Sequence, residues 1–340
     1  MGIDKSLRIA CVGAGYFSQF HRDGWARLDG ADVVGVCDHD LAAAQSTGIT
    51  AYSDLVTMIE TETPDVLDVI LPPKAHADTI RTAMQAGVKT IICQKPFCRD
   101  LAEATALTQA ANAAGVTLII HENFRFMPWY RTIRNILDEG GLGTVLQATF
   151  RLRPGDGQGP DAYMDRQPYF QTMPQLLIHE TGIHWVDVFR FLFGDPTHVY
   201  ADLRKVNPAI AGEDAGFVLL DHPEDIRVLL DGNRLLDHAA DNHRRTMGEA
   251  LIEGTKASLS LYGDGSVWQR PFGARSAVCV APANTHENFG GDCVFEFQKH
   301  VIEGISGRGT LVNTAQDYLT VIRARDAIYL SAETGQKQAL

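Results

Sequence analysis

The sequence predicts an α/β protein whose doubly wound parallel sheet is followed by an α+β domain with a large, mostly antiparallel open sheet. Three observations support this prediction. Short apolar runs alternate with helical stretches over residues 7–121, strand-like runs recur over residues 145–262, and 340 residues exceed what one core usually organises. We therefore expect two domains, residues 1–122 and residues 123–340.

In the first domain, the apolar runs have the length and composition of strands that are buried on both faces. Strands are expected at residues 7–12, 32–37, 66–71, 90–93 and 118–121. Helical patterns fall between them, at residues 17–28, 54–60, 75–86 and 101–114. This alternation predicts a parallel sheet covered by helices on both faces.

The second domain follows a further helix, expected at residues 128–139, and a cluster of glycines. Its strands are expected at residues 145–152, 199–206, 216–220, 226–230, 249–253 and 257–262. Asp231-Gly232-Asn233 has the composition of a turn between two of them. A helix at 181–193 interrupts the strands, and two more, from about residue 293 and from residue 314, follow them. Asn313 and Gln316 have the spacing of a helix N-terminal capping pair.

Composition limits the partners that this chain can have. Asp and Glu outnumber Lys and Arg by 42 to 30, and no basic block is present, so neither nucleic acid nor an anionic membrane surface is an expected partner. No apolar segment approaches the roughly 20 residues that a membrane-spanning helix needs, and no secretory signal is evident. The six cysteines form no C-x-x-C pair or zinc-ligand spacing. We expect a cytoplasmic protein that uses no metal.

A glycine motif, Gly13-Ala14-Gly15-Tyr16-Phe17-Ser18, directly follows the first expected strand. In a Rossmann domain the first glycine makes the tight turn, the second lets backbone N–H groups approach a pyrophosphate, and the third position is small. Ser18 takes that third position. Because glycine turns between strand and helix are common, the motif needs support from its context.

That context is Asp38, which ends the second expected strand at about the distance from the glycines where a ribose-binding carboxylate lies. Such a carboxylate accepts hydrogen bonds from the ribose hydroxyls and repels a 2′-phosphate. The next residues, His39 and Asp40, supply no arginine that would neutralise one. The pattern favours NAD over NADP and makes His39 a further candidate contact. The alternative is that Asp38 only caps the next helix.

Two further patterns carry side chains suited to proton transfer. Gln94-Lys95-Pro96 ends a strand at the edge of the sheet where ligands bind, and a lysine partly buried beside a cofactor gives up its proton more readily than an exposed one. Glu180 and His184 lie four residues apart at the start of a helix, which places both on one face. A histidine can remove a hydroxyl proton, and a nearby carboxylate can orient its ring. Taken alone, Lys95 could be an ordinary exposed lysine, and Glu180 and His184 could be an ordinary pair on a helix surface.

In this order, the motifs resemble those of the glucose-fructose oxidoreductase, inositol dehydrogenase and rhizopine catabolism (Gfo/Idh/MocA) family over essentially the whole chain. In that family the glycine motif is followed by Glu-Lys-Pro at the end of the fifth strand and then by Asp-x-x-x-His. Gln94-Lys95-Pro96 and Glu180-x-x-x-His184 look like these two motifs. The Leu71-Pro72-Pro73 turn, with His76, resembles the family's strand-four turn along the nicotinamide. Asn123 and Arg125 resemble the entry to its second domain.

The resemblance implies an NAD-dependent dehydrogenase that oxidises a hydroxyl of a sugar, polyol or inositol. Lys95 would bridge cofactor and substrate hydroxyl, His184 would take the hydroxyl proton, and Glu180 would hold the substrate or the histidine. The family also implies a homodimer or homotetramer. The cofactor contacts would come from the following residues: Gly13, Gly15, Tyr16, Phe17, Ser18, Asp38, His39, Leu71, Pro72, Pro73, His76, Gln94 and Lys95.

Two departures from the family pattern favour a specialised substrate. Gln94 stands where the family has glutamate, which removes a negative charge next to Lys95, and Glu180 stands where the family has aspartate, which adds one methylene. The segment 156–175 is expected to be a long loop that contributes substrate contacts. Tyr163 and Gln171 from this loop, with Arg125, are the substrate candidates. A loop that contacts another subunit is the alternative.

Two other functions stay open. Some relatives of this family keep NAD bound, oxidise a sugar transiently and reduce it again, which makes them glycosidases or lyases without net NADH production. Others bind a dinucleotide without turnover and act as sensors, although the presence of Lys95 and His184 argues against that. The sequence leaves open which sugar or polyol is the substrate.

Overall fold

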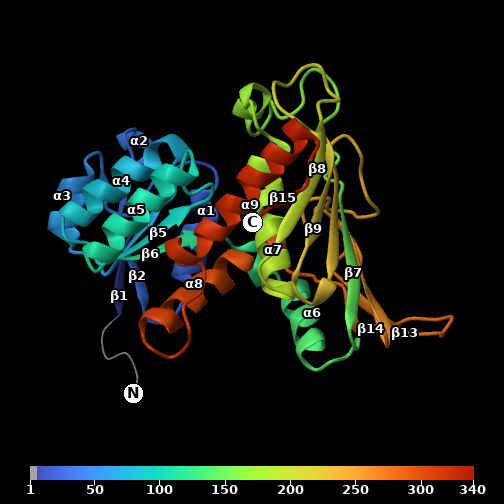
Figure 1. Ribbon diagram of the computed structural model, residues 1–340. Coiled ribbons are helices and arrows are strands. Elements are labelled where there is room, and N and C mark those ends of the chain that lie inside the picture. The colour runs from blue at the N-terminus through green and yellow to red at the C-terminus, as the bar shows by residue number, and fades with distance from the viewer. Residues whose placement is uncertain (1–5) are drawn as a thin grey trace. The chain divides into compact units, whose positions relative to one another are not determined.

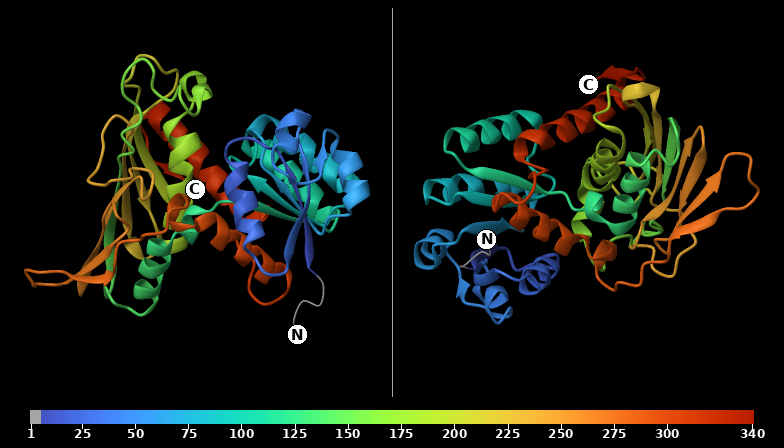
Figure 2. Two further views of the ribbon diagram at one scale, coloured as in Figure 1. Left: turned by 180° about the vertical axis from the view of Figure 1, so that it is seen from behind. Right: turned by 90° about the horizontal axis from the view of Figure 1, so that it is seen from below.

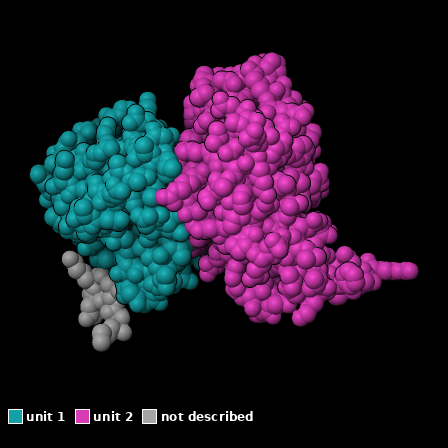
Figure 3. Space-filling model, in the orientation of Figure 1, with its two compact units in different colours: residues 1–123, 294–319 teal, residues 124–293, 320–340 magenta. Residues whose placement is uncertain are grey.

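The computed structural model describes residues 6–340 and divides into two compact units (Figure 3). Unit 1 holds the described residues up to 123 together with residues 294–319, and unit 2 holds residues 124–293 and 320–340. The expected boundary at 122/123 lies beside this division, but the expected second domain differs from it because the chain returns to unit 1 after residue 293. Residues 1–5 of the expected first domain lie outside the described residues.

Long-range hydrogen bonds explain why residues 294–319 belong to unit 1. The amide of Gln298 donates to the backbone oxygen of His21 at 2.9 Å, and the side-chain amide of Asn313 donates to the backbone oxygen of Glu122 at 2.8 Å. The predicted capping pair of Asn313 and Gln316 is wrong, because the side-chain nitrogen of Asn313 bonds to Glu122 and its side-chain oxygen has no hydrogen-bond partner among the described residues. The hydroxyl of Thr314 instead accepts the backbone N–H of Asp317 at 3.3 Å.

The sheet of unit 1 is fully parallel, with the strand order β3-β2-β1-β4-β5-β6. All five expected strands are confirmed, and the two-residue β3 was missed because so short a pairing leaves no pattern. The strands are β1 (Leu7–Val12), β2 (Ala31–Cys37), β3 (Ala51–Tyr52), β4 (Val66–Val69), β5 (Thr90–Gln94) and β6 (Thr117–His121).

Helices cover both faces of this sheet (Figures 1 and 2). They are α1 (Ser18–Ala26), α2 (Leu41–Gln45), α3 (Leu55–Glu62), α4 (Pro73–Gln85), α5 (Leu101–Ala113) and α8 (Cys293–Ile305). Helices α3, α4 and α5 lie side by side on one face, as right-handed crossovers toward β6 require, and α1 lies on the other face with α8. A Cβ at Gly24 of α1 would stand 2.0 Å from the side-chain oxygen of Gln298, so the buried side chain of Gln298 would have to move.

The sheet of unit 2 has nine strands in the order β14-β13-β12-β11-β7-β10-β9-β8-β15, and only β7 and β10 pair in parallel. This confirms a mostly antiparallel sheet. The strands are β7 (Val145–Leu152), β8 (His198–Arg204), β9 (Ala215–Asp221), β10 (Arg227–Asn233), β11 (Gly248–Gly254), β12 (Ala257–Leu261), β13 (Val267–Pro271), β14 (Val278–Ala281) and β15 (Gln338–Ala339). The predicted turn at 231–233 is wrong, because Gly232 pairs with Leu152 and Gly216 inside β10.

One face of this sheet is buried and the other is largely exposed. Phe150, Val218 and Leu230 belong to the buried face, and Trp185 packs on Phe150 with 4.5 Å between ring centroids. The helical segments are η1 (Phe124–Phe126), α6 (Pro128–Asp138), η2 (Pro168–Thr172), η3 (Leu177–Gly182), α7 (Ile183–Phe193), η4 (Pro223–Asp225), η5 (Phe289–Gly291) and α9 (Ala315–Thr334). Across residues 6–340, none of the helices combines the length and apolarity needed to cross a membrane.

Candidate active site

The glycine motif makes a turn between β1 and α1 that only glycine permits at its first position. Gly13 has a φ of +105°, and a Cβ there would stand 2.3 Å from the backbone oxygen of Ile70. A Cβ at Gly15 would meet no atom within 4 Å, so the backbone there faces open space. The fully buried Ser18 donates its hydroxyl hydrogen to the backbone oxygen of Gly15 at 2.6 Å. The turn therefore has the room at Gly15 that close approach of a pyrophosphate needs.

Asp38 follows β2 and holds the glycine turn in place. One carboxylate oxygen accepts the backbone N–H of Ala14 at 2.7 Å, and the other accepts the backbone N–H of Asp40 at 2.9 Å. Asp40, not Asp38, caps α2, because its carboxylate accepts the N–H groups of Ala42 and Ala43. The helix-cap alternative for Asp38 is therefore wrong. His39 has a side chain that is 96% exposed, with its ring nitrogen 2.8 Å from Asp38.

His76 joins the turn after β4 to the turn after β5. Its fully buried ring has Nε2 at 2.7 Å from the backbone oxygen of Leu71 and Nδ1 at 3.0 Å from that of Pro96. Burial lowers the pKa of His76, although its hydrogen bonds to backbone oxygens oppose this shift. These contacts hold the backbone of the Leu71-Pro72-Pro73 turn to that of Pro96. A direct contact between His76 and the cofactor stays a prediction.

Gln94, the last residue of β5, lies in a buried network that the sequence did not reveal. Its amide nitrogen is 2.7 Å from Nε2 of His21 and 3.3 Å from Nδ1 of His121, and its oxygen accepts the backbone N–H of Lys95 at 3.1 Å. Asp68 accepts from the other ring nitrogen of His21 at 2.8 Å. Lys95 itself is partly exposed and is followed by a cis peptide bond to Pro96.

In unit 2, Glu180 and His184 lie on either side of a change in helix type. Glu180 belongs to the π-helical turn η3, and His184 belongs to the first turn of α7. The α-helix expected from residue 181 therefore begins at residue 183, and a π-helical turn precedes it. π-Helical turns are uncommon and are often found at functional sites. The buried ring of His184 stacks on Phe124 with a centroid distance of 3.7 Å and an interplanar angle of 3°.

Arg125, a substrate candidate, forms a buried ion pair. Its guanidinium donates to both carboxylate oxygens of Asp187 in α7, at 2.7 and 2.5 Å. Arg190 lies 3.7 Å from the same carboxylate. These charges fix the helix that carries His184, and a substrate contact by Arg125 stays a prediction.

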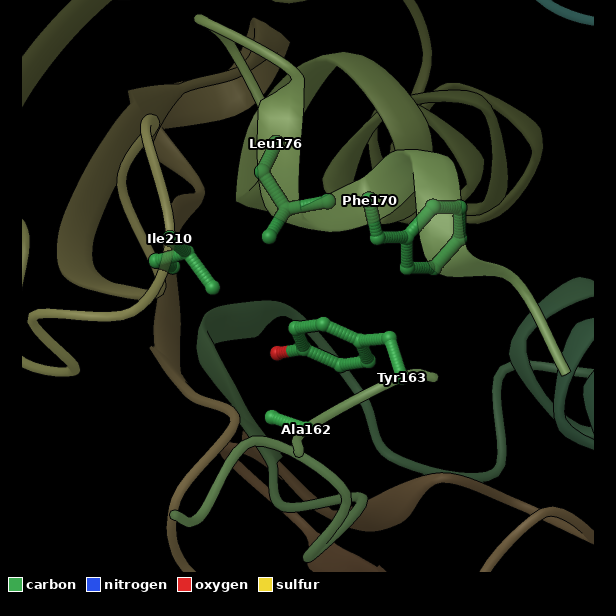
Figure 4. Close-up of a cluster of buried hydrophobic side chains, with 5 residues drawn as sticks. All are labelled: Ala162, Tyr163, Phe170, Leu176 and Ile210. Atoms are coloured by element: carbon green, nitrogen blue, oxygen red, sulfur yellow. The ribbon is translucent and has the colours of Figure 1, made fainter. Parts of the chain in front are cut away.

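The segment 156–175 is irregular apart from η2, as expected, and contains the other two substrate candidates. Tyr163 is 7% exposed, and its ring lies in a hydrophobic cluster with Ala162, Phe170, Leu176 and Ile210 (Figure 4). The amide of Gln171 donates to the backbone oxygens of Pro160 and Ala162, both at 2.9 Å. Both side chains therefore shape the loop, and their contact with a substrate is untested.

Arg234 ties this loop to the turn that carries Glu180. Its fully buried guanidinium donates to Asp156 at 2.7 Å and to the hydroxyl of Thr181 at 2.5 Å, and it lies over the ring of Tyr163 at 5.0 Å. Arg234, His21, Asp68 and Phe124 were not predicted from the sequence. For Arg234, the available signal was its position shortly after an expected strand.

The glycine turn, the carboxylate after β2 and the doubly wound sheet define the dinucleotide-binding domain of an oxidoreductase. Residues 7–122 match the sequence model of the Gfo/Idh/MocA oxidoreductase family with its NAD-binding Rossmann fold, and residues 130–260 match the family's C-terminal domain. The chain belongs to this family. The predicted family, fold class and NAD cofactor are thereby confirmed.

Individual relatives agree with this assignment. D-apiose dehydrogenase of Paraburkholderia graminis is 32% identical and aligns over 98% of this chain and 89% of its own. Inositol 2-dehydrogenase of Rhizobium meliloti is 24% identical over 72% of this chain and 73% of its own. The crystal structure of an oxidoreductase from Agrobacterium radiobacter with NAD+, L-tartaric acid and magnesium superposes with a TM-score of 0.88, at 25% identity and with 98% of both chains covered.

Proposed function

We propose that this protein is an NAD-dependent dehydrogenase that oxidises a hydroxyl of a sugar, polyol or inositol, with D-apiose as the first substrate to test. The observation that carries the proposal is the similarity to D-apiose dehydrogenase of Paraburkholderia graminis along nearly the whole chain. A relative of this chain is thus named for the oxidation of a branched sugar, and a second D-apiose dehydrogenase, from Rhizobium rhizogenes, is 27% identical over 97% of this chain.

The residues of unit 1 fit NAD. Bound NAD supplies the acceptor for the hydride that leaves the substrate carbon. The open backbone at Gly15 and the N-terminus of α1 would hold the pyrophosphate, because Phe17 gives that helix end no side-chain cap. Asp38 would accept the ribose hydroxyls with the carboxylate lone pairs that Ala14, Asp40 and the ring of His39 leave open. The same negative charge disfavours a 2′-phosphate.

Lys95 and His184 would manage the proton. The ammonium of Lys95 donates to the substrate hydroxyl and stabilises the negative charge that develops on its oxygen. The hydroxyl proton passes to a ring nitrogen of His184 while the hydrogen on the same carbon leaves with its electron pair. The stack on Phe124 holds the ring of His184 in one plane, and Glu180 holds the substrate or orients this ring.

The test is the absorbance of NADH while the purified protein and NAD meet a panel of D-apiose, other pentoses, hexoses, inositols and polyols. We expect turnover with one class and its loss in Lys95→Ala and His184→Ala. Lys89→Ala, which alters an exposed lysine just before β5, is the matched control and should keep full activity. The absence of NADH with every compound, despite measured NAD binding, would contradict the proposal.

We also propose a cytoplasmic homodimer or homotetramer that associates through the exposed face of the unit 2 sheet. A row of mostly apolar side chains crosses five neighbouring strands there: Tyr200, Leu219, Leu229, Thr149 and Leu251. Tyr200 and Leu251 are 42% and 39% exposed. Light scattering should give a multiple of the chain mass, with a shift toward monomer in Tyr200→Lys. A monomer in the unaltered protein would overturn this.

A further inference from the structure

A chain of buried polar side chains links β4, α1 and the end of β5 in unit 1 and ends at Lys95. It starts at Asp68 in β4, passes through His21 in α1 and reaches Gln94 at the end of β5. The side chains of Asp68 and His21 are 0% exposed, and Gln94 is 7% exposed. Because water is excluded from these groups, their hydrogen-bond donors and acceptors must match one another.

Asp68 fixes the proton on His21. One carboxylate oxygen of Asp68 lies 2.8 Å from Nδ1 of His21 and accepts the indole N–H of Trp25 at 2.8 Å. A carboxylate only accepts, so Nδ1 of His21 carries a hydrogen. In the neutral ring, Nε2 then has a lone pair and needs a donor.

Gln94 supplies that donor, and this decides how its amide is oriented. With the amide nitrogen 2.7 Å from Nε2 of His21 and 3.3 Å from Nδ1 of His121, each N–H of Gln94 has an acceptor, and the carbonyl oxygen faces the backbone N–H of Lys95 at 3.1 Å. The reversed amide would place an oxygen against the lone pair of His21 and two donors against each other at Lys95. Only the first orientation satisfies all three contacts of the Gln94 amide.

Other side chains pack around His21. Its ring packs against those of His121, at 4.1 Å between centroids, and Phe17, at 5.6 Å, while Gln298 of α8 donates to its backbone oxygen. Burial raises the pKa of the thiols of Cys11 and Cys93, which interact electrostatically with Asp68, so both stay neutral. Asp68 is the charged group that contacts a ring nitrogen of His21, and this contact determines the tautomer.

We propose that Asp68 and His21 are positioning residues of this oxidoreductase: Asp68 sets the Nδ1–H tautomer of His21, His21 orients the amide of Gln94, and Gln94 holds the backbone N–H of Lys95. The effect on turnover rests on the proposed function, in which Lys95 meets the substrate. The inference also gives a reason for glutamine at position 94. A carboxylate there would turn only acceptors toward Nε2 of His21 and would require one additional proton.

Two substitutions of His21 separate positioning from packing. Both remove the ring, but the side-chain oxygen of His21→Gln can stand in for Nε2 and accept from Gln94, whereas the side-chain nitrogen of His21→Asn can stand in for Nδ1 and keeps only the bond to Asp68. The readout is hydrogen exchange at the amide of Lys95, which overlapping peptides isolate because Pro96 has no N–H. This readout needs no turnover.

We expect exchange at Lys95 to be about tenfold faster or more in His21→Asn than in His21→Gln, and kcat to fall by a similar factor while the KM for NAD stays the same. Equal exchange in the two variants would overturn the proposal. Different exchange without turnover on any polyol would support the positioning chain and contradict the proposed function, so the two failures are distinguishable.

The unaltered protein offers a test that does not depend on how the variants fold. Long-range ¹H–¹⁵N NMR of the histidine rings, with His21→Gln to assign the signals, should show a neutral His21 protonated at Nδ1 near pH 7. A hydrogen on Nε2, in the other tautomer or in the imidazolium, would overturn the proposal because Gln94 would then have to turn its oxygen toward His21.

Discussion

The surroundings of Lys95 in unit 1 and of His184 in unit 2 are built from different interactions. Beside Lys95, a neutral amide and two imidazole rings form hydrogen bonds, and a single buried carboxylate sets their direction. Beside His184, the aromatic ring of Phe124 stacks on the imidazole, and the ion pair of Arg125 with Asp187 fixes the helix.

This difference predicts different sensitivities. Hydrogen bonds are directional, so an isosteric change that swaps a donor for an acceptor should alter the position of Lys95 without creating a cavity. Stacking and buried charge tolerate changes in orientation but not the loss of volume or of a counter-charge. Substitutions near Lys95 should therefore affect turnover more than stability, and those near Asp187 should affect stability more.

The largest effect is expected for Lys95→Ala. Removal of a group that donates to the reacting hydroxyl should lower kcat/KM by about 1,000-fold, because groups that move or stabilise a proton contribute roughly 10²- to 10⁴-fold. The unfolding free energy should change by less than about 1 kcal/mol because the side chain is partly exposed. Steady-state kinetics and urea unfolding would measure both, with Lys89→Ala as the control. A kcat/KM of Lys95→Ala within tenfold of that of the unaltered protein would contradict the proposed role of Lys95.

Asp187→Asn should reverse this pattern. Loss of the carboxylate leaves Arg125 and Arg190 buried without their shared counter-charge, which should cost about 3 to 5 kcal/mol of unfolding free energy. Asp138→Asn, in the exposed pair of Arg134 and Asp138, is the matched control and should cost less than about 1 kcal/mol. Chemical denaturation would compare the two. Similar costs would show that burial of the Arg125 pair does not matter.

His222 extends the comparison to a buried ring with only one nitrogen paired. Nδ1 donates to the backbone oxygen of Gly194 at 2.8 Å, whereas Nε2 has no partner among the described residues. Burial lowers the pKa of His222 from 6.5 to about 4. Because the unfolded chain then binds the proton more readily, stability should be complete above pH 6.5 and should fall by roughly 2 to 3 kcal/mol as the pH falls toward 4.

Urea unfolding of His222→Leu over this range gives the test. The substitution should flatten that part of the pH profile, and His198→Gln, which changes an exposed histidine in β8, should leave it unchanged. An unaltered slope in His222→Leu would assign the pH dependence to other groups.

Phe124→Leu should have the smallest effect. The shorter side chain loses the stack on His184 and the edge contact with Trp185 but keeps the site apolar, which should cost about 1 kcal/mol of stability. We expect kcat to fall severalfold with little change in the KM for NAD, since the imidazole keeps its place but gains freedom. Stopped-flow kinetics would measure this. A loss as large as that of His184→Ala would mean that the stack, not the imidazole, limits turnover.

The sequence predicted those parts of the fold that depend on local pattern. Residues 9–12 are all apolar and all buried in β1, and the expected strand matches the observed bounds. Strand β14 was missed because three of its four residues are exposed and carry no burial signal. The return of residues 294–319 to unit 1 was also missed, because it depends on contacts such as that of Asn313 with Glu122, 191 positions away.

The site shows the same division. Gly13, Asp38 and Lys95 could be found because each is part of a short motif next to a strand. His21 and Asp68 could not, because the partners in their network lie 47 and 73 positions apart and no local spacing links them. A single aspartate inside the apolar run of β4 and a histidine in α1 were the signals available. Their meaning depends on the fold, which brings them together.

Hydride transfer to NAD as the net reaction can be tested by following one hydrogen atom. D-apiose, or the sugar or polyol that gives turnover, is prepared with deuterium on the carbon that is oxidised and incubated with NAD and the protein, and the NADH formed is analysed by mass spectrometry. We expect NADH to accumulate with one deuterium per molecule. NADH without the label, or a labelled sugar that returns unchanged or cleaved while no NADH accumulates, would contradict hydride transfer as the net reaction.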